Sequence, residues 1–347
     1  MSEKNYLQWL SSETITVWWH DSGDPKEVEA GKSNGAIGVT TNPVLSFRAI
    51  RDNMDLWEKE IAQISSISGK PEKAEALTRL VVTNTARVFE PQFTENNQQS
   101  GYVCGQIDPS LCSDRKKMID MALRFSSWAP NISIKFPATA AGLDAFEECV
   151  AQGISCTSTV SFSVAQVVAA AERYKKGKLR AEKAGIRPKP SYAVIMIGRI
   201  DDYLREVILD RKAEISEDTI KQAGIAITKR AYRIFKERGY EAKLIIAALR
   251  GAHHMTSLCG GDLIMSIHPK IQKILLSEKL SRESEIDTEV SQKTIDELSI
   301  IPEFIKAYSP EGMTEEDFIT FGVSQKTMTQ FYHGGWVLLE DFNLDKK

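Results

Sequence analysis

ISIKFPAT, residues 132–139, places a lysine within a short run of isoleucine, phenylalanine and small side chains. A run of this kind predicts a buried β-strand, in which a charged amine is costly to bury without a partner. Lys135 therefore needs either an ionic partner or a chemical role. Seven similar apolar runs end in a polar residue or a turn, and they are residues 15–24, 35–43, 101–109, 153–162, 192–200, 242–250 and 262–269.

The segments between these runs have the periodicity of helices. Residues 141–151 carry apolar side chains at spacings of three and four, residues 163–175 are rich in alanine, and residues 216–238 open with a good N-cap serine. Strands that alternate with helices predict βα units and a parallel sheet. Eight such units close a (β/α)8 TIM barrel, which is the α/β fold that we expect. A doubly wound open sheet is the alternative, although the chain has no GxGxxG fingerprint.

Additional helices are expected outside the eight units. They are predicted near residues 55–65 and 72–89, and at 314–322 and 324–341. The last of these carries three aromatic residues, Phe331, Tyr332 and Trp336, which either face a partner subunit in a homodimer or fold back over the active site. We favour the fold-back.

One domain is expected to span residues 1–347. The barrel is placed at about 13–280, and a C-terminal helical cap at about 281–347. The alternative is that the tail forms a separate small domain.

Composition narrows the class of protein. The chain has 347 residues, a formal net charge of −3 and no strongly basic stretch, so nucleic acid is not an expected partner. Its N-terminus lacks the apolar core of a signal peptide, and no apolar run reaches membrane-spanning length. The five cysteines are scattered without CxxC spacing, which fits a reducing compartment and not a zinc ribbon. We therefore expect a soluble, cytoplasmic protein without a membrane partner.

Polar residues at the strand ends are the candidate site residues, because barrel active sites lie at the carboxyl ends of the strands. In chain order they are Asp21, Thr41, Asn42, Gln106, Asp108, Lys135, Thr157, Thr159, Arg199, Arg250, Ser266 and His268. Several have ordinary structural explanations. Asp21 begins a DSGD turn, Asn42 precedes a proline, and Arg199 is two and three residues from two aspartates. Lys135 has no comparable explanation inside a packed barrel.

A lysine desolvated among apolar neighbours becomes a nucleophilic amine that forms a Schiff base with a carbonyl substrate. The iminium then acts as an electron sink, so that a nearby C–C bond can be cleaved or formed. This chemistry needs an acid/base, and Asp21 is the carboxylate best placed at the strand ends. Arg199 and Arg250, on neighbouring strands, suit an anionic group such as a phosphate.

These residues make the chain resemble the transaldolases, which are Schiff-base enzymes with a (β/α)8 barrel. The resemblance covers most of the chain in order. Its motifs are DSGD (21–24), TTNP (40–43), IKFPAT–GL (134–143), GI…T…FS–AQ (153–166), GRI–D (198–201), AALR (247–250) and IHP (267–269). TTNP together with the lysine strand is the specific part of the pattern.

The resemblance implies a role for most of the candidate residues. Lys135 would form the Schiff base, and Asp21 would act as acid/base at the bond being broken. Asn42 would hold hydroxyls of the dihydroxyacetone unit, and Thr159 would help to place the catalytic water. Arg199 and Arg250 would bind the substrate phosphate. No cofactor and no metal are implied.

Four positions depart from the family pattern. Gln106 stands where transaldolases carry a glutamate that relays protons with a water, whereas the fructose-6-phosphate aldolases resemble this chain in having glutamine. An amide cannot titrate, although it can orient a water. Thr157 replaces a donor-binding asparagine. Val194 replaces a phosphate-binding serine and Met196 an aromatic residue, so the substrates are expected to differ from the standard ones.

The leading hypothesis is a transaldolase that transfers a dihydroxyacetone unit from a ketose phosphate, such as sedoheptulose 7-phosphate or fructose 6-phosphate, to an aldehyde. An aldolase that releases free dihydroxyacetone, or a relative with a non-standard sugar substrate, is the close alternative. A non-catalytic sugar-phosphate binder is a further one. A metal-dependent hydrolase would use a set of acidic and imidazole side chains, namely His20, Asp21, His253, His254 and His268. The spacing disfavours it, because adjacent strand residues point to opposite faces.

Overall fold

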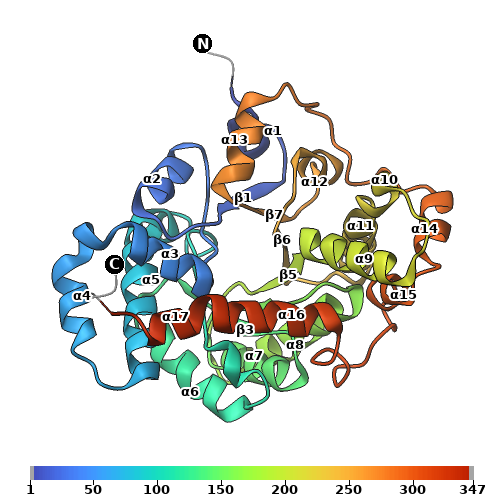
Figure 1. Ribbon diagram of the computed structural model, residues 1–347. Helices are drawn as coiled ribbons and strands as arrows, with labels where there is room; N and C mark the ends of the chain where they lie inside the picture. The colour runs from blue at the N-terminus through green and yellow to red at the C-terminus, as the bar shows by residue number, and fades with distance from the viewer. Residues whose placement is uncertain (1–3, 344–347) are drawn as a thin grey trace.

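The computed structural model describes residues 4–343 and contains one curled parallel sheet. Within these residues the sheet has seven strands in the order β1-β7-β6-β5-β4-β3-β2. The strands are β1 (Val17–His20), β2 (Val103–Gln106), β3 (Ile132–Pro137), β4 (Cys156–Thr159), β5 (Tyr192–Met196), β6 (Lys243–Ala247) and β7 (Ile264–Ile267). All six pairings are parallel. The protein is an α/β barrel of the TIM type, as the sequence predicts (Figure 1).

The eighth position of the barrel is occupied by residues 37–40, which are too short to count as a strand. Val39 forms parallel bridges to both His20 and Val103. Its amide donates to Tyr102 O at 2.9 Å, and its carbonyl accepts from the Cys104 amide at 2.9 Å. The predicted strand at 35–43 is therefore wrong in length but right in place, since this segment joins β1 to β2.

Large aromatic side chains fill the lower part of the barrel. Trp19 on β1 and Tyr192 on β5 meet edge to face with ring centroids 4.8 Å apart, and Tyr102 lies 6.1 Å from Tyr192. Strands β1 and β5 stand on opposite sides of the ring, so the first contact crosses the interior. Because side chains alternate along a strand, Asp21 points to the same side as Trp19, but nearer the carboxyl end.

Helices surround the sheet, as Figure 1 shows. They are α1 (Tyr6–Glu13), α2 (Pro25–Ser33), α3 (Pro43–Asp52), α4 (Glu58–Ser65), α5 (Lys70–Glu95), α6 (Arg115–Ser126), α7 (Ala140–Ala151), α8 (Val164–Lys183), α9 (Ile197–Arg211), α10 (Glu217–Ile220), α11 (Ala223–Arg238), α12 (Ala252–Leu258) and α13 (Pro269–Ser277), with 3-10 turns η1 (Met54–Trp57) and η2 (Pro109–Leu111). The predicted helix at 216–238 is two helices, α10 and α11. The predicted strand at 192–200 ends at Met196, so Arg199 lies in the first turn of α9.

The C-terminal segment folds back across the barrel. It contains α14 (Gln292–Leu298), α15 (Pro302–Tyr308), α16 (Gly322–Phe331), the π-helix η3 (Tyr332–Trp336) and α17 (Val337–Glu340). Figure 1 shows α16 and α17 as a red band that runs in front of the sheet. Phe331 and Trp336 are both buried against the rest of the chain, and Phe331 lines the cavity described below, whereas Trp336 does not.

Two details of this segment differ from the prediction. Residues 315–320 form successive turns and not an α-helix, because their backbone amides donate mainly to the carbonyl three residues back, as from Asp317 to Thr314 O at 3.1 Å and from Thr320 to Asp317 O at 3.0 Å. The predicted helix at 324–341 is three consecutive pieces with a π-helix in the middle. Gly335 in this π-helix lies against the start of α3, and a Cβ there would be 2.5 Å from the Val44 amide nitrogen.

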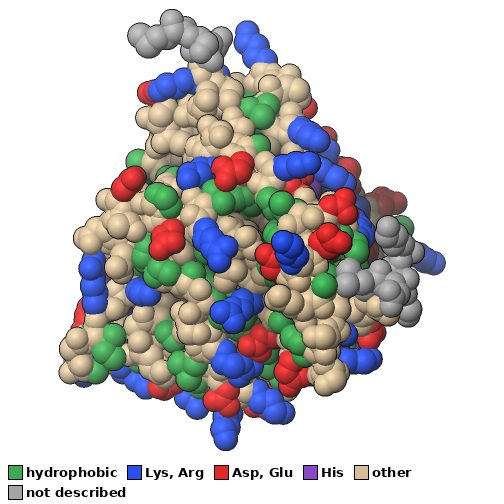
Figure 2. All heavy atoms as spheres, turned by 90° about the vertical axis from the view of Figure 1, so that its left-hand side faces the viewer, with side chains coloured by type: hydrophobic (Ala, Val, Ile, Leu, Met, Phe, Trp, Pro, Cys, Tyr) green, Lys and Arg blue, Asp and Glu red, His purple; other side chains and the backbone are tan. Residues whose placement is uncertain are grey.

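The outer surface mixes charges of both signs. Figure 2 shows the face around α2, α4 and α5, where basic and acidic side chains of the described residues are interspersed with small hydrophobic groups. Among residues 4–343, no helix is both long enough and apolar enough to cross a membrane.

Candidate active site

A cavity of about 400 Å³ opens at the carboxyl ends of the strands. Of the polar residues at the strand ends, its lining contains Asp21, Asn42, Lys135, Thr159, Arg199, Arg250, Ser266 and His268. Gln106 and Thr157 are not part of the lining. The wall also contains Val194 and Met196 from β5, so the apolar surface expected beside Arg199 is present.

Lys135 lies on β3 and is 6% exposed. Its Nζ donates a hydrogen bond to the backbone carbonyl of Thr41 at 3.0 Å, and within residues 4–343 it has no carboxylate partner. The carbonyl belongs to the TTNP segment, which follows the eighth position of the barrel. The amine is therefore held at the cavity wall by a neutral acceptor and not by an ion pair.

Asp21 extends from the end of β1 into the same cavity. The Thr40 hydroxyl donates to its Oδ1 at 2.7 Å and lies 2.6 Å from the Ser266 hydroxyl. Three neighbouring positions of the barrel thus form one chain of hydrogen bonds. The carboxylate follows β1, the threonine lies at the eighth position, and the serine lies on β7. This chain of hydrogen bonds fixes the direction of the Asp21 carboxylate, and the residue lines the cavity.

The polar residues nearest Lys135 differ in their surroundings. Gln106 on β2 and Thr157 on β4 are both in register with Lys135. The Thr157 hydroxyl lies 2.8 Å from that of Ser133 and does not reach the cavity. The side-chain oxygens of Gln106 and Thr159 are buried and have no hydrogen-bond partner within residues 4–343.

Asn42 serves first as a helix cap. Its side-chain oxygen accepts from the Leu45 amide at 3.1 Å, which satisfies an otherwise unpaired group in the first turn of α3. Pro43 follows at the first helical position, where its missing N–H costs nothing. The cap fixes the side chain at the cavity edge, so its amide nitrogen is the group that remains available to a ligand.

Arg199 enters the cavity from the first turn of α9. Its guanidinium donates to Gln330 Oε1 at 2.5 Å and lies over the Phe331 ring, with its Cζ 5.3 Å from the centroid. Both partners belong to α16. Burial, followed by the charge of Arg250, lowers the pKa of Arg199 to about 10. Its Nε is buried and without a partner within residues 4–343, so the side chain is short of acceptors.

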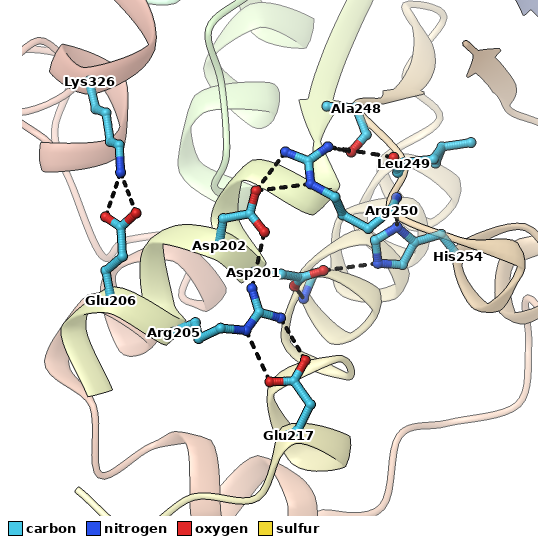
Figure 3. Close-up of polar contacts among 11 residues, drawn as sticks. Asp201, Asp202, Arg205, Glu206, Glu217, Ala248, Leu249, Arg250, His254 and Lys326 are labelled. Carbon is cyan, nitrogen blue, oxygen red and sulfur yellow. Dashed lines mark hydrogen bonds and ion pairs between the residues drawn. The ribbon is translucent and has the colours of Figure 1, made fainter. Parts of the chain in front are cut away.

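Arg250 is oriented by α9, as Figure 3 shows. Its Nε and one terminal nitrogen both donate to Asp202 Oδ2, at 2.9 and 2.6 Å, and the other terminal nitrogen donates to Ala248 O at 2.8 Å. Gly198 permits this approach, since a Cβ there would lie 2.3 Å from Ala248 O. Ala248 has a positive φ of 59°, an uncommon conformation for alanine that is typical of functional loops.

A buried pair of side chains stands behind Arg250. His254 Nδ1 accepts from the Arg250 amide at 3.2 Å, so the proton is on Nε2, which donates to Asp201 Oδ2 at 2.9 Å (Figure 3). Burial raises the pKa of Asp201, while His254 opposes the rise. Asp201 Oδ1 also accepts from the Gly224 amide at 2.8 Å. Asp201 therefore pairs with His254 and Asp202 with Arg250, and neither pairs with Arg199.

The five residues of the metal-hydrolase alternative do not form one cluster. His20 points outside the barrel, where Gln272 donates to its Nδ1 at 2.9 Å. Ligand atoms of Asp201, His253 and His254 do lie within 4.8 Å of one another. However, both ring nitrogens of His254 are already engaged in the hydrogen bonds just described, so the cluster is explained as a support for the Arg250 loop.

The lining also includes charged, polar and aromatic side chains that the sequence did not single out as binding groups, among them Arg48, Lys270, Gln330 and Phe331. Arg48 and Lys270 are exposed and form no ion pair within residues 4–343, so the mouth carries more positive charge than predicted. Arg48 lies on α3, one helical turn beyond Val44, and Lys270 follows His268 by two residues, so neither stands at the end of a strand.

Fold and site together define the class of this chain. It is a TIM-type barrel that gathers an amine, a carboxylate and two guanidinium groups at the carboxyl ends of its strands. The family model described as Transaldolase/Fructose-6-phosphate aldolase matches residues 18–331. The chain therefore belongs to this family, as the sequence motifs indicate.

Curated relatives agree with the family. The chain is 30% identical over 246 residues to a protein named Transaldolase from Mycobacterium tuberculosis (strain ATCC 25618 / H37Rv), an alignment that covers 66% of this chain and 64% of the relative. It is 28% identical over 265 residues to Transaldolase 1 of Streptomyces avermitilis, with 73% and 69% covered. The chain thus spans slightly less than two thirds of the length of the mycobacterial relative.

Proposed function

We propose that the protein is a transaldolase that moves a dihydroxyacetone unit from a ketose phosphate to an aldehyde through a Schiff base on Lys135. Sedoheptulose 7-phosphate and fructose 6-phosphate are the donors that fit this chemistry. The observation that carries the proposal is the buried amine of Lys135, which lies on the cavity wall with only a backbone carbonyl as its partner. A lysine in such a place is far more useful as a nucleophile than as a structural cation.

In the proposed reaction, Lys135 Nζ attacks the ketone carbon of the donor. The carbinolamine loses water and gives an iminium. Asp21 then takes the proton of the hydroxyl on the far carbon of the C–C bond that breaks, and the electrons of that bond move toward the iminium nitrogen. The aldehyde fragment leaves, and the three-carbon unit stays on the lysine. The reverse steps with an acceptor aldehyde return the proton from Asp21, and water releases the product.

Other polar groups have supporting roles in this proposal. The amide nitrogen of Asn42 would hold hydroxyls of the dihydroxyacetone unit. The buried oxygens of Thr159 and Gln106 lack partners within the described chain and would bind the water that forms and hydrolyses the iminium. Thr157 would act indirectly at most, because its hydroxyl is occupied by Ser133.

Arg199 and Arg250 would bind the donor phosphate. Both line the cavity, they follow the paired strands β5 and β6, and guanidinium groups match phosphate oxygens well. A phosphate beside Arg199 would also supply the acceptor that its buried Nε lacks.

The competing function is that of an aldolase that releases dihydroxyacetone. Gln106 favours it, since an amide at this position cannot relay a proton. Sugar phosphates are the proposed partners in either case. The five cysteines are unpaired thiols, which supports a cytoplasmic location.

Steady-state kinetics separate the two functions. With fructose 6-phosphate as donor, a transferase should show ping-pong kinetics and depend on an acceptor aldehyde such as erythrose 4-phosphate. An aldolase should release dihydroxyacetone at the same rate without acceptor. If purified protein does neither with any ketose phosphate, the proposed function is wrong.

A further inference from the structure

Gln330 is a neutral polar side chain that is hydrogen-bonded to Arg199, and it comes from a distant part of the chain. It lies in α16 and lines the cavity, whereas Arg199 begins α9. The hydrogen bond between them, 2.5 Å from the guanidinium to Oε1, joins residues 131 apart in the sequence. The next residue, Phe331, is 2% exposed and packs under the guanidinium, which fixes this turn of α16.

The orientation of the Gln330 amide follows from its partner. A guanidinium offers only donors, so the amide oxygen must face Arg199 and the amide nitrogen must lie on the other branch. Within residues 4–343 this nitrogen has no acceptor, and the exposed side chain lines the cavity. Two N–H donors are thus held next to Arg199, in a direction set by the arginine itself.

The neighbouring wall has few donors of its own. Val194 and Met196 occupy the positions nearest Arg199 on β5 and cannot donate a hydrogen bond. Arg250 already gives two of its N–H groups to Asp202. An anion at Arg199 would therefore find fewer partners from the barrel than its oxygens can accept, and Gln330 is the group placed to add one.

We propose that Gln330 is an anion-binding residue of the cavity, which donates from its amide nitrogen to the phosphate that Arg199 holds. The kind of ligand rests on the proposed function, but the binding of an oxyanion does not. The C-terminal segment, through α16, is then part of the substrate site and not only a cover for it.

A competing role of Gln330 predicts the opposite change in anion affinity. If the Gln330 oxygen merely occupies Arg199 and must be displaced by the anion, then removing the amide should tighten anion binding. If Gln330 donates to the anion, removing the amide should weaken binding. Gln330→Met keeps the length of the side chain and removes both the donor and the acceptor, so it distinguishes the two roles.

The test is calorimetric titration of the full chain with inorganic phosphate, for wild type, Gln330→Met and Gln325→Met. Gln325 is a matched control, because it is an exposed glutamine on the same helix outside this cavity. We expect Gln330→Met to weaken phosphate binding roughly 3- to 10-fold, the value of one neutral hydrogen bond. Gln325→Met should leave it unchanged. The Michaelis constant for fructose 6-phosphate should rise by the same factor as the phosphate dissociation constant.

Unchanged or tighter phosphate binding by Gln330→Met would overturn the proposal, and so would a wild-type protein that binds no phosphate. Borohydride trapping on Lys135 is measured in parallel. Loss of phosphate affinity in Gln330→Met without a trapped adduct in wild type would leave the anion site standing and refute the Schiff-base function. The two proposals thus fail separately.

Discussion

Lowering the pH from 7 to 5 should destabilise this protein by about 2 kcal/mol through His20 alone, and His20→Gln should remove that part of the pH dependence. His20 ends β1, directly before Asp21, with its ring outside the barrel and 1% exposed. Burial, followed by the charge of His268, lowers the pKa of His20 from 6.5 to about 4, while Asp24 opposes the shift.

The direction of the pH effect on stability follows from comparing the folded and the unfolded chain. The unfolded chain takes up a proton on His20 as the pH falls below about 6.5, whereas the folded chain resists until about pH 4. Stability from this residue is therefore fully present above pH 6.5 and is lost as the solution is acidified through that window. The structure supplies the reason, since Gln272 donates to His20 Nδ1 and Nε2 is buried without a partner within residues 4–343. A second proton would find no acceptor.

Urea denaturation of wild type and His20→Gln at pH 7 and pH 5 measures the effect. The relevant quantity is the difference between the two proteins in the free energy lost on acidification, because any constant cost of the substitution cancels. His253→Gln is the control. Burial also lowers the pKa of His253 to about 4, but this residue is only partly buried, so its contribution should be smaller. Equal losses in wild type and His20→Gln would refute the reasoning.

Three further predictions concern the cavity. Asp21→Asn should lower turnover by about 100-fold or more while a borohydride-trapped adduct still forms, because it removes the acid/base and spares the nucleophile. Gln106→Glu should raise transfer relative to dihydroxyacetone release, and an unchanged ratio of the two products would show that the residue has no part in the relay. Gly335→Ala should cost about 1–3 kcal/mol in thermal or urea unfolding and raise the Michaelis constant for the donor, since the added Cβ would press on Val44 beside Asn42.

The barrel could be predicted from the sequence because each of its strands and helices has a local sequence signal. Each apolar run and each helix shows its own periodicity, and counting the runs gave the number of positions in the ring. The segment at 35–43 was read as a full strand because its residues have strand composition. In the structure only Val39 forms bridges, since Gly35 has a left-handed φ of 98° and Asn42 begins the cap of α3.

The sequence could not predict how far each inward-pointing side chain extends toward the cavity. Alternation says that Lys135 and Thr157 both point inward, and they are in register. The lysine reaches the cavity because its side chain is long, whereas the threonine stops at Ser133. The position of Gln330 in the cavity could not be predicted for a different reason. Its place beside Arg199 depends on how α16 packs across the barrel, and no local pattern records such a contact.

The most direct test of the central claim is to incubate the protein with fructose 6-phosphate, reduce with borohydride and map the modified peptide by mass spectrometry. We predict a single adduct of a reduced three-carbon unit or of the whole sugar on Lys135, and none in Lys135→Ala. An adduct on another lysine, or no adduct with any ketose phosphate or free ketose, would contradict the account.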